Sequence, residues 1–62
     1  MSVYLLMRGA LPEAVFTSIP RAARYVRDEQ AELEAAVYEV LLDSPHIAPQ
    51  LIGVDWQAEA EA

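Results

Sequence analysis

Few side chains in this sequence could perform covalent or acid–base chemistry. His46 is the one histidine and there is no cysteine, so thiol nucleophiles and thiolate metal ligands are absent. Ser44 lies two residues before His46, but neighbouring residues alone do not form a nucleophile, a base and its orienting group. Asp43, His46 and Asp55 match no compact metal motif. We therefore expect a chain that is not an enzyme, with no catalytic residue, no metal site and no cofactor.

Charge is distributed unevenly along the chain. Ten acidic residues against four arginines give a net charge of −6, and there is no lysine. Residues 1–27 hold all four arginines and one glutamate, whereas residues 28–62 hold nine acids and no base. Because phosphates repel such a chain, direct nucleic-acid binding is not expected. The acidity either keeps a small domain in solution or forms a surface that docks on a basic protein.

Three of the arginines form a regular pattern. Arg21, Arg24 and Arg27 recur every three residues and would form a stripe on a helix, where Arg24 can pair with Asp28. The stripe is either a solvated helix face or a patch that meets phosphate or acidic groups, since guanidinium suits bidentate contacts. The opposite pole is acidic and includes Glu29, Glu32 and Glu39.

The elements that would position these side chains begin with a hairpin. Residues 3–7 are β-branched, aromatic or aliphatic and predict a strand. Residues 9–13 contain glycine and proline and predict a turn, and residues 14–17 predict a second strand. The two strands are close enough to pair as an antiparallel hairpin with a loop of about five residues.

A capped helix follows the hairpin, over about residues 20–33. Thr17 or Ser18 can accept a hydrogen bond from the free backbone N–H groups, and Pro20 suits the first turn because it has no N–H to satisfy. One face is marked by residues at helical spacing, namely Ala22, Ala23, Val26, Gln30 and Leu33.

The chain after residue 33 allows two interpretations. Either the helix continues to residue 42, because no Gly, Pro or Asn separates the two segments, or residues 37–42 form a third strand. We prefer the strand, since a lone hairpin is marginally stable, whereas a third strand gives a sheet large enough for a helix to pack on. Residues 51–56 predict a short fourth strand or an ordered arm, and residues 57–62 are expected to fray.

These elements predict one compact α+β domain over residues 1–56 with a frayed tail at 57–62. The order ββαβ(β) gives a small antiparallel sheet with one helix packed on one face. A chain of 62 residues buries only about 60% of its unfolded surface and has no disulfide to stabilise it. Oligomerisation or a binding partner is therefore an expected source of stability.

One helix can cover only one face of the sheet, so the other face should be apolar and exposed. We expect that face to present some of Tyr4, Leu6, Phe16, Val37 and Leu41, unless the arm with Trp56 folds over it. Trp56 is interpreted as a core anchor or lid, or else as an interface hot spot. The candidate partner interface comprises Tyr4, Leu6, Leu41, Trp56, Glu29, Glu32, Glu39, Arg21, Arg24 and Arg27.

The pattern of elements resembles a group of small proteins from phages and mobile elements. The resemblance covers residues 3–43: the strand, the Gly9 turn, the second strand, the arginine helix and the strand ending in Leu-Asp. In size and acidity the chain is similar to anti-CRISPR and other host-inhibiting phage proteins. That similarity implies stoichiometric binding to a host protein, in some cases by mimicry of nucleic acid. The arginine stripe departs from a uniformly acidic mimic.

The sequence thus favours a small acidic protein-binding module without enzymatic activity. In its specific form, it is a phage-encoded inhibitor that occupies a surface of a host nucleic-acid-handling protein. The alternative is a structural or assembly subunit that homo-oligomerises, or joins a larger complex, through its exposed sheet face. No apolar run reaches the length of a membrane helix, so no membrane is expected as a partner. We expect the protein in the cytoplasm, which is the host cytoplasm if a phage encodes it.

Overall fold

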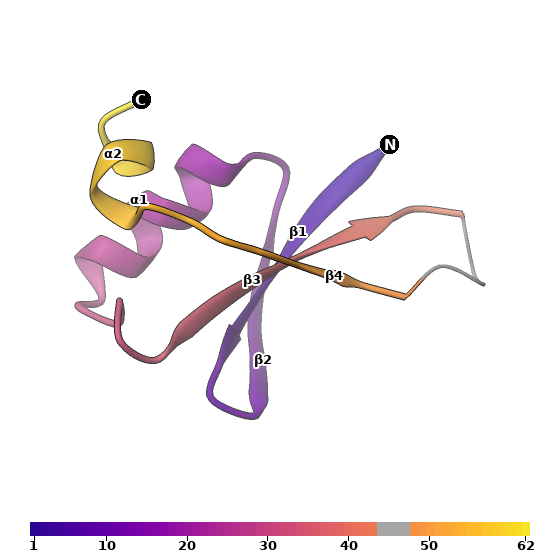
Figure 1. The fold of residues 1–62 in the computed structure, drawn as a ribbon, viewed down its shortest axis with the longest axis horizontal. Helices are drawn as coiled ribbons and strands as arrows, with labels where there is room; N and C mark the ends of the chain where they lie inside the picture. Colours follow the sequence, from indigo (N-terminus) through magenta and orange to yellow (C-terminus); the bar gives the residue numbers. More distant parts are fainter. Residues whose placement is uncertain (44–47) are drawn as a thin grey trace.

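The chain forms an antiparallel sheet with helices on one of its faces (Figure 1). The computed structural model describes residues 1–43 and 48–62. Their elements are β1 (Ser2–Arg8), β2 (Leu11–Phe16), α1 (Ile19–Asp28), β3 (Ala35–Leu41), β4 (Gln50–Ile52) and α2 (Trp56–Ala60). The strand order is β2-β1-β3-β4, and every neighbouring pair is antiparallel. The predicted α+β fold, with a helix on one face of a small antiparallel sheet, is confirmed.

The β1–β2 hairpin is tighter than predicted. Arg8 pairs with Leu11, which leaves a two-residue connection in which Gly9 takes a φ of 61°. A glycine at the first position of such a loop supplies the positive φ that the twist of a hairpin favours. The register then shifts, so that Glu13 is an extra residue between the partners of Leu6 and Met7.

Helix α1 begins as expected and ends early. Ser18 is the N-cap, and its Oγ accepts a hydrogen bond from Arg21 N at 3.4 Å. The predicted extension to residue 33 is wrong, because the chain turns at Gln30, whose φ is 54°. Gln30 N donates to the carbonyl of Arg27 at 3.1 Å, and Ala31 N donates to that of Val26 at 3.0 Å. These two bonds form the Schellman motif that closes many helices.

The early end of α1 settles the alternatives for the next segment. The chain returns as β3, which confirms the predicted third strand and excludes one long helix. Leu33 was expected on the apolar face of the helix; instead it lies in the turn before β3 and its side chain is fully exposed, at 102%. Ala22, Ala23 and Val26 are buried, as the helical spacing predicts.

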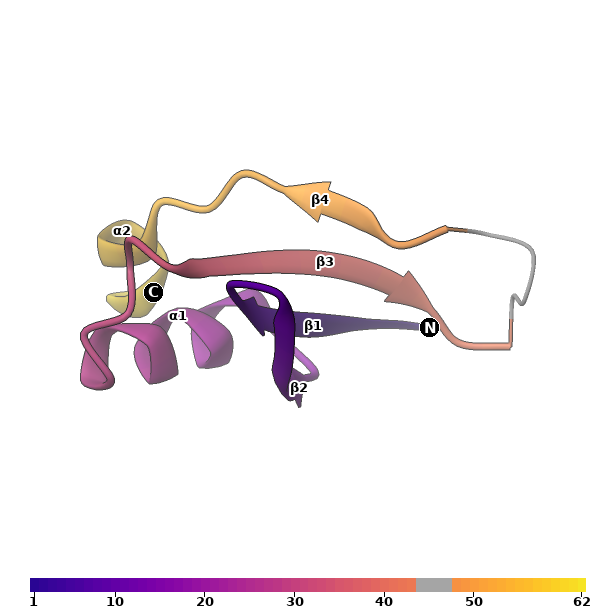
Figure 2. The ribbon, with the colours of Figure 1, turned by 90° about the horizontal axis from the view of Figure 1, so that it is seen from below.

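The C-terminal residues pack, contrary to the expected frayed tail. β4 is the predicted fourth strand, shortened to three residues, and α2 follows it. Asp55 caps α2, with its Oδ1 accepting from Ala58 N at 3.2 Å. Figures 1 and 2 show α2 packed beside α1 at one end of the molecule, and Ala60 is buried there. Arg24 Nη1 also donates to the backbone oxygen of Ala62 at 3.2 Å.

The core lies between α1 and one face of the sheet. Its large, fully buried side chains among the described residues are Leu6, Val26 and Val37. Partly buried aromatic rings surround them, including Tyr4, Phe16, Tyr25 and Trp56. Neither helix of the part of the chain described here is long and apolar enough to cross a membrane.

Candidate interaction surface

The register of the strands divides their side chains into two faces. Leu6 and Val37 are opposite one another and lie under α1, with exposures of 1% and 0%. Their neighbours along each strand must point the other way, because side chains alternate in a strand. The second face, here called the open face, therefore carries nine strand residues: Val3, Leu5, Met7, Pro12, Val15, Ala36, Tyr38, Val40 and Leu51.

The centre of the open face is one continuous row across the sheet. Val15 pairs with Leu5, Leu5 pairs with Tyr38, and Tyr38 pairs with Leu51, so the row crosses all four strands. The two ends of the row are the most accessible, with Val15 exposed to 60% and Leu51 to 65%. A shallow hollow lies beside the centre and is lined by Leu5, Met7, Tyr38 and Pro49.

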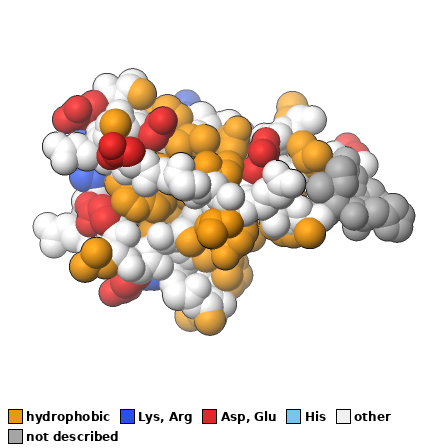
Figure 3. All heavy atoms as spheres, viewed as in Figure 1, with side chains coloured by type: hydrophobic (Ala, Val, Ile, Leu, Met, Phe, Trp, Pro, Cys, Tyr) orange, Lys and Arg blue, Asp and Glu red, His pale blue; other side chains and the backbone are white. Residues whose placement is uncertain are grey.

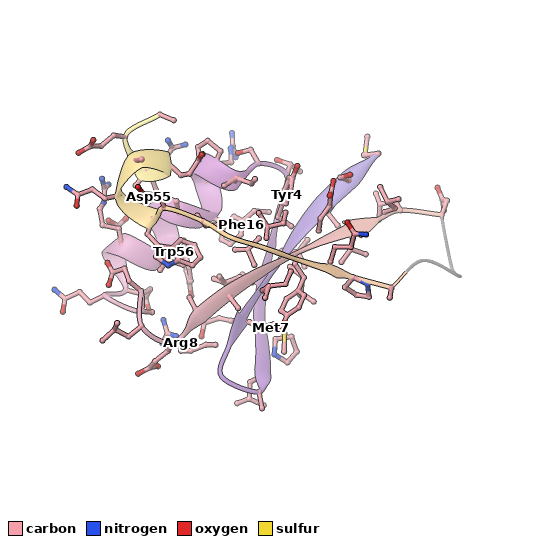
Figure 4. All side chains as sticks on the ribbon, in the orientation of Figure 1. Tyr4, Met7, Arg8, Phe16, Asp55 and Trp56 are labelled. Carbon is pink, nitrogen blue, oxygen red and sulfur yellow. The ribbon has the colours of Figure 1, made fainter. Side chains whose placement is uncertain are left out.

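Both described helices lie on the other side of the sheet. Figure 4 shows Met7 pointing away from α1, whereas Tyr4, Phe16 and Trp56 lie on the side of α1. The C-terminal arm therefore adds Trp56 to the core and does not cover the open face, so Trp56 is a core anchor. In Figure 3 hydrophobic side chains gather over the crossing strands, while most acidic side chains lie towards the helices.

The assignment of the two faces is the reverse of the one expected from sequence. We expect some of Tyr4, Leu6, Phe16, Val37 and Leu41 on the exposed face. Leu6 and Val37 are instead buried, Tyr4 and Phe16 pack against them, and Leu41 alone of the five is exposed, at 36%. The covered face even includes two charged residues, Arg8 and Glu39, whereas none of the nine open-face residues is charged. The more apolar face is thus the one left open.

The alternating pattern of the strands groups the residues of this surface together, but it does not indicate that they are exposed. Val3, Leu5 and Met7 share one face of the first predicted strand, and Tyr38 and Val40 share one face of the third. The sequence signal that marks them is their uniform lack of charge. Ordinarily that signal indicates the covered face, so sequence alone gave the wrong side.

The charged candidates gather at the helical end of the molecule, away from the open face. Arg27 Nε lies 3.7 Å from Asp28 Oδ1, so Asp28 pairs with this arginine and the expected pair with Arg24 is replaced. Glu29 is the C-cap of α1, and Glu32 lies in the following turn. Glu39 lies apart from these acids, on β3, where its Oε2 accepts a hydrogen bond from Ser2 Oγ at 2.7 Å.

A small polar network joins the hairpin to the end of α1. Arg8 Nη2 lies 3.1 Å from Glu13 Oε2 and 3.6 Å from Glu29 Oε1. The Tyr25 hydroxyl donates to the same Glu13 oxygen at 2.9 Å. This hydrogen bond, together with burial and the nearby carboxylates of Glu13 and Glu29, raises the pKa of Tyr25 above 10.0. Nε and Nη2 of Arg8 are buried in the described part of the chain and make no hydrogen bond, so Arg8 meets the two carboxylates through ion pairs only, whereas Tyr25 and Glu13 are joined by a hydrogen bond.

A second hollow lies where α1 meets α2. It is lined by Arg27, Glu32, Trp56, Gln57 and Glu61, and so brings together three of the predicted site residues. Among residues 1–43 and 48–62, no three His, Cys, Asp or Glu side chains are placed to hold a metal ion. Ser44 and His46, considered above for nucleophilic and metal chemistry, lie outside the described residues.

Comparison with protein families, with curated proteins and with solved structures found no match for this chain. The functional argument therefore rests on the surface itself. Of the open-face residues, Tyr38 alone has a polar side-chain group, so this surface is suited to excluding water against another apolar surface rather than to acid–base or nucleophilic chemistry.

Proposed function

We propose that this chain is a non-enzymatic protein-interaction module whose docking surface is the open face. One observation carries the proposal: the helices cover the sheet face that holds Arg8 and Glu39. The face that they leave open has no charged side chain. A chain that had to satisfy only its own core would bury the more apolar face. A contiguous apolar patch of this kind on a small protein is typical of an interaction site.

The gain from covering the open face is large on the scale of a small domain. Full burial of a Val or Leu side chain contributes about 1.5–3 kcal/mol. Val15 and Leu51 are more than half exposed, at opposite ends of the central row, so a partner could bury much of both. Burial of the exposed part of both side chains would contribute about 2–4 kcal/mol, a substantial fraction of the total stability of a small domain, about 5–15 kcal/mol.

Photo-crosslinking in the cells that make the protein tests this proposal. A photoreactive amino acid replaces Leu51 on the open face, and the same amino acid replaces Leu33 as the control, since Leu33 is even more exposed but lies in the α1–β3 turn. A discrete protein adduct formed from position 51 and absent from position 33 is expected. The same weak, heterogeneous adducts from both positions would overturn the proposal.

The narrower form of the proposal is an inhibitor, phage-encoded and acting in the host cytoplasm, that occupies a basic surface of a nucleic-acid-handling protein. Its support is the exposed acidic series Asp28, Glu29, Glu32 and Glu34 at the end of α1, with Glu61 nearby on the hollow between the helices. Basic surfaces attract such a series and phosphates compete with it.

The inhibitor is tested with charge-neutral variants that spare structural contacts. Glu32→Gln with Glu34→Gln removes two exposed charges, whereas Glu39→Gln is the control because Glu39 lies apart and bonds to Ser2. If the adduct from position 51 contains a different, basic protein, the double variant should weaken that complex about tenfold at 0.1 M salt, while the control leaves it unchanged. If the wild type, the double variant and the control bound with equal affinity, the acidic series would not contribute to binding.

A further inference from the structure

We propose that the occupant of the open face is a second copy of this chain, packed face to face about a two-fold axis. The inference rests on the proposed function, because it takes the open face as the docking surface and names the partner. It would give the molecule a second core, between two sheets, in addition to the core under α1.

The first argument is the small size of the existing core. Leu6, Val26 and Val37 are its large, fully buried side chains among the described residues, and most of the remaining core positions are alanines. Domains of this length usually gain stability from disulfides, metals or oligomerisation. The chain has no cysteine, and the described residues place no metal-binding group. A second copy supplies the missing core without requiring any other molecule.

The second argument is the position of the charges. Two copies with a net charge of −6 each repel one another if their acidic residues meet. Glu13 and Glu39 make their contacts on the helical side of the sheet, Glu29 is the C-cap of α1, and Glu32 and Glu34 lie in the α1–β3 turn. Face-to-face packing would therefore bury no charged strand residue and direct the acidic ends outwards.

The third argument is that the open face can complement itself. In a two-fold interface the same patch meets its own copy, so it must offer both a projection and a recess. Val15 and Leu51 project at the two ends of the central row, and the hollow beside Leu5, Met7 and Tyr38 lies between them. Packed sheets stand about 10 Å apart with their side chains interleaved, which lets a projecting side chain of one copy enter the hollow of the other.

The size of the patch sets the expected strength. Four strands about 4.8 Å apart and three rows about 6.7 Å apart give a footprint of about 400 Å² on each copy. With the relief of the side chains, two copies would bury about 1,000 Å² in total, at the lower limit of specific interfaces. We therefore expect a reversible dimer, with a dissociation constant in the micromolar range.

The test is the solution mass of the purified full chain, measured by light scattering and sedimentation from about 1 µM to 1 mM. The mass should rise from that of one 6.9 kDa chain towards twice that value. Val15→Glu and Leu51→Glu, at the two ends of the row, should each raise the dissociation constant at least tenfold. Both side chains are mostly exposed in the single chain, so circular dichroism should show that the variants still fold.

Leu33→Glu is the matched control, since it makes the same chemical change at a fully exposed leucine away from the open face. It should leave the dissociation constant unchanged. A wild-type chain that remains monomeric at 1 mM, or a dimer that tolerates both face variants, would overturn the inference. If the chain is monomeric and position 51 still crosslinks specifically to a different protein, the inference fails and the proposed function stands. The absence of any adduct specific to position 51, with itself or another protein, would overturn both.

Discussion

Gln30 shows how a single residue sets the boundary between helix and strand. Its φ of 54° lies in the left-handed region. The Schellman motif that closes α1 requires this conformation of the residue after the C-cap, which is Gln30. Glycine adopts this conformation without the steric cost that a Cβ atom brings. The helix end was missed from sequence because glutamine, rather than glycine or asparagine, occupies the position. Its hydrogen bonds and the buried pair of Val26 and Ala31 enforce the turn instead.

Gln30→Gly should therefore stabilise the fold. Relief of the left-handed strain outweighs the extra flexibility of glycine in the unfolded chain, for a net gain of about 0.5 kcal/mol. Gln30→Val, which puts a β-branched side chain at the same φ, should destabilise by about 1 kcal/mol or more. Urea unfolding of the two variants beside the wild type measures both effects. Changes of the same sign would show that the φ of residue 30 does not limit stability.

Tyr25 provides a prediction about pH. Its hydrogen bond to the Glu13 carboxylate raises the pKa of the folded phenol above 10.0, so the folded chain holds the proton more tightly than the unfolded chain. The resulting stabilisation is complete below about pH 10 and is lost as the pH rises through the raised value. Tyr25→Phe should therefore lose less stability than the wild type between pH 9 and 11.

Ultraviolet titration of the tyrosines tests the cause of that shift. Glu13→Gln should lower the pKa of one of the three tyrosines, because it removes the charged acceptor. Glu39→Gln serves as the control, since the hydrogen bond of Glu39 is with Ser2. If Glu13→Gln left the titration unchanged, the hydrogen bond would not be the source of the shift.

At the scale of the elements, local signals predicted that each strand exists and where the helix begins, although β2 starts at Leu11, inside the predicted turn. Ser18 and Pro20 are where an N-cap and a first-turn proline are expected, and the composition of residues 37–42 favoured a strand over a longer helix. The side of the sheet that the helix covers could not be predicted in this way. Alternation groups Leu5 with Met7 and Leu6 with Arg8, but the group that α1 covers depends on the handedness and length of the connections.

Helix α2 shows a second limit of local signals. It has five residues, too few to be stable alone, and its sequence of Ala, Glu and Gln suggested fraying. Its order comes from tertiary contacts: Ala60 is buried against α1, Trp56 packs on the core, and Arg24 binds the backbone oxygen of Ala62. These contacts join residues far apart in the chain, so a reading of residues 57–62 by themselves could not find them.

The cap of α2 should control whether Trp56 remains in the core. Asp55→Ala removes the acceptor for Ala58 N, a loss of about 1 kcal/mol, and should release α2 from α1. The fluorescence of Trp56, the one tryptophan, should then shift to longer wavelength as water reaches the ring. Asp55→Asn keeps a capping oxygen and should retain the wild-type spectrum. An unshifted spectrum for Asp55→Ala would mean that packing alone holds the helix.

At the scale of the whole molecule, the two layers separate two kinds of surface. The helical layer carries the arginine stripe and the exposed acids around the end of α1, and the opposite side of the sheet carries a row of uncharged side chains across all four strands. This separation allows the open face to pair with an identical face while the acidic ends stay available to another partner. Pairing of two copies through the open face and binding of a basic protein by the acidic series at the end of α1 are therefore compatible in one molecule.

The separation also predicts the response of self-association to salt. Contacts across the open face involve no ion pair, whereas the net charge of −6 on each copy opposes their approach. Raising NaCl from 0.1 M to 0.5 M shortens the Debye length from about 10 Å and screens this repulsion. The dissociation constant of the dimer, measured by sedimentation, should fall by about twofold to fivefold. Glu32→Gln with Glu34→Gln should reduce that salt dependence, because fewer charges then repel. A dissociation constant that rises with salt would mean that attraction between charged groups, and not the uncharged face, holds the copies together.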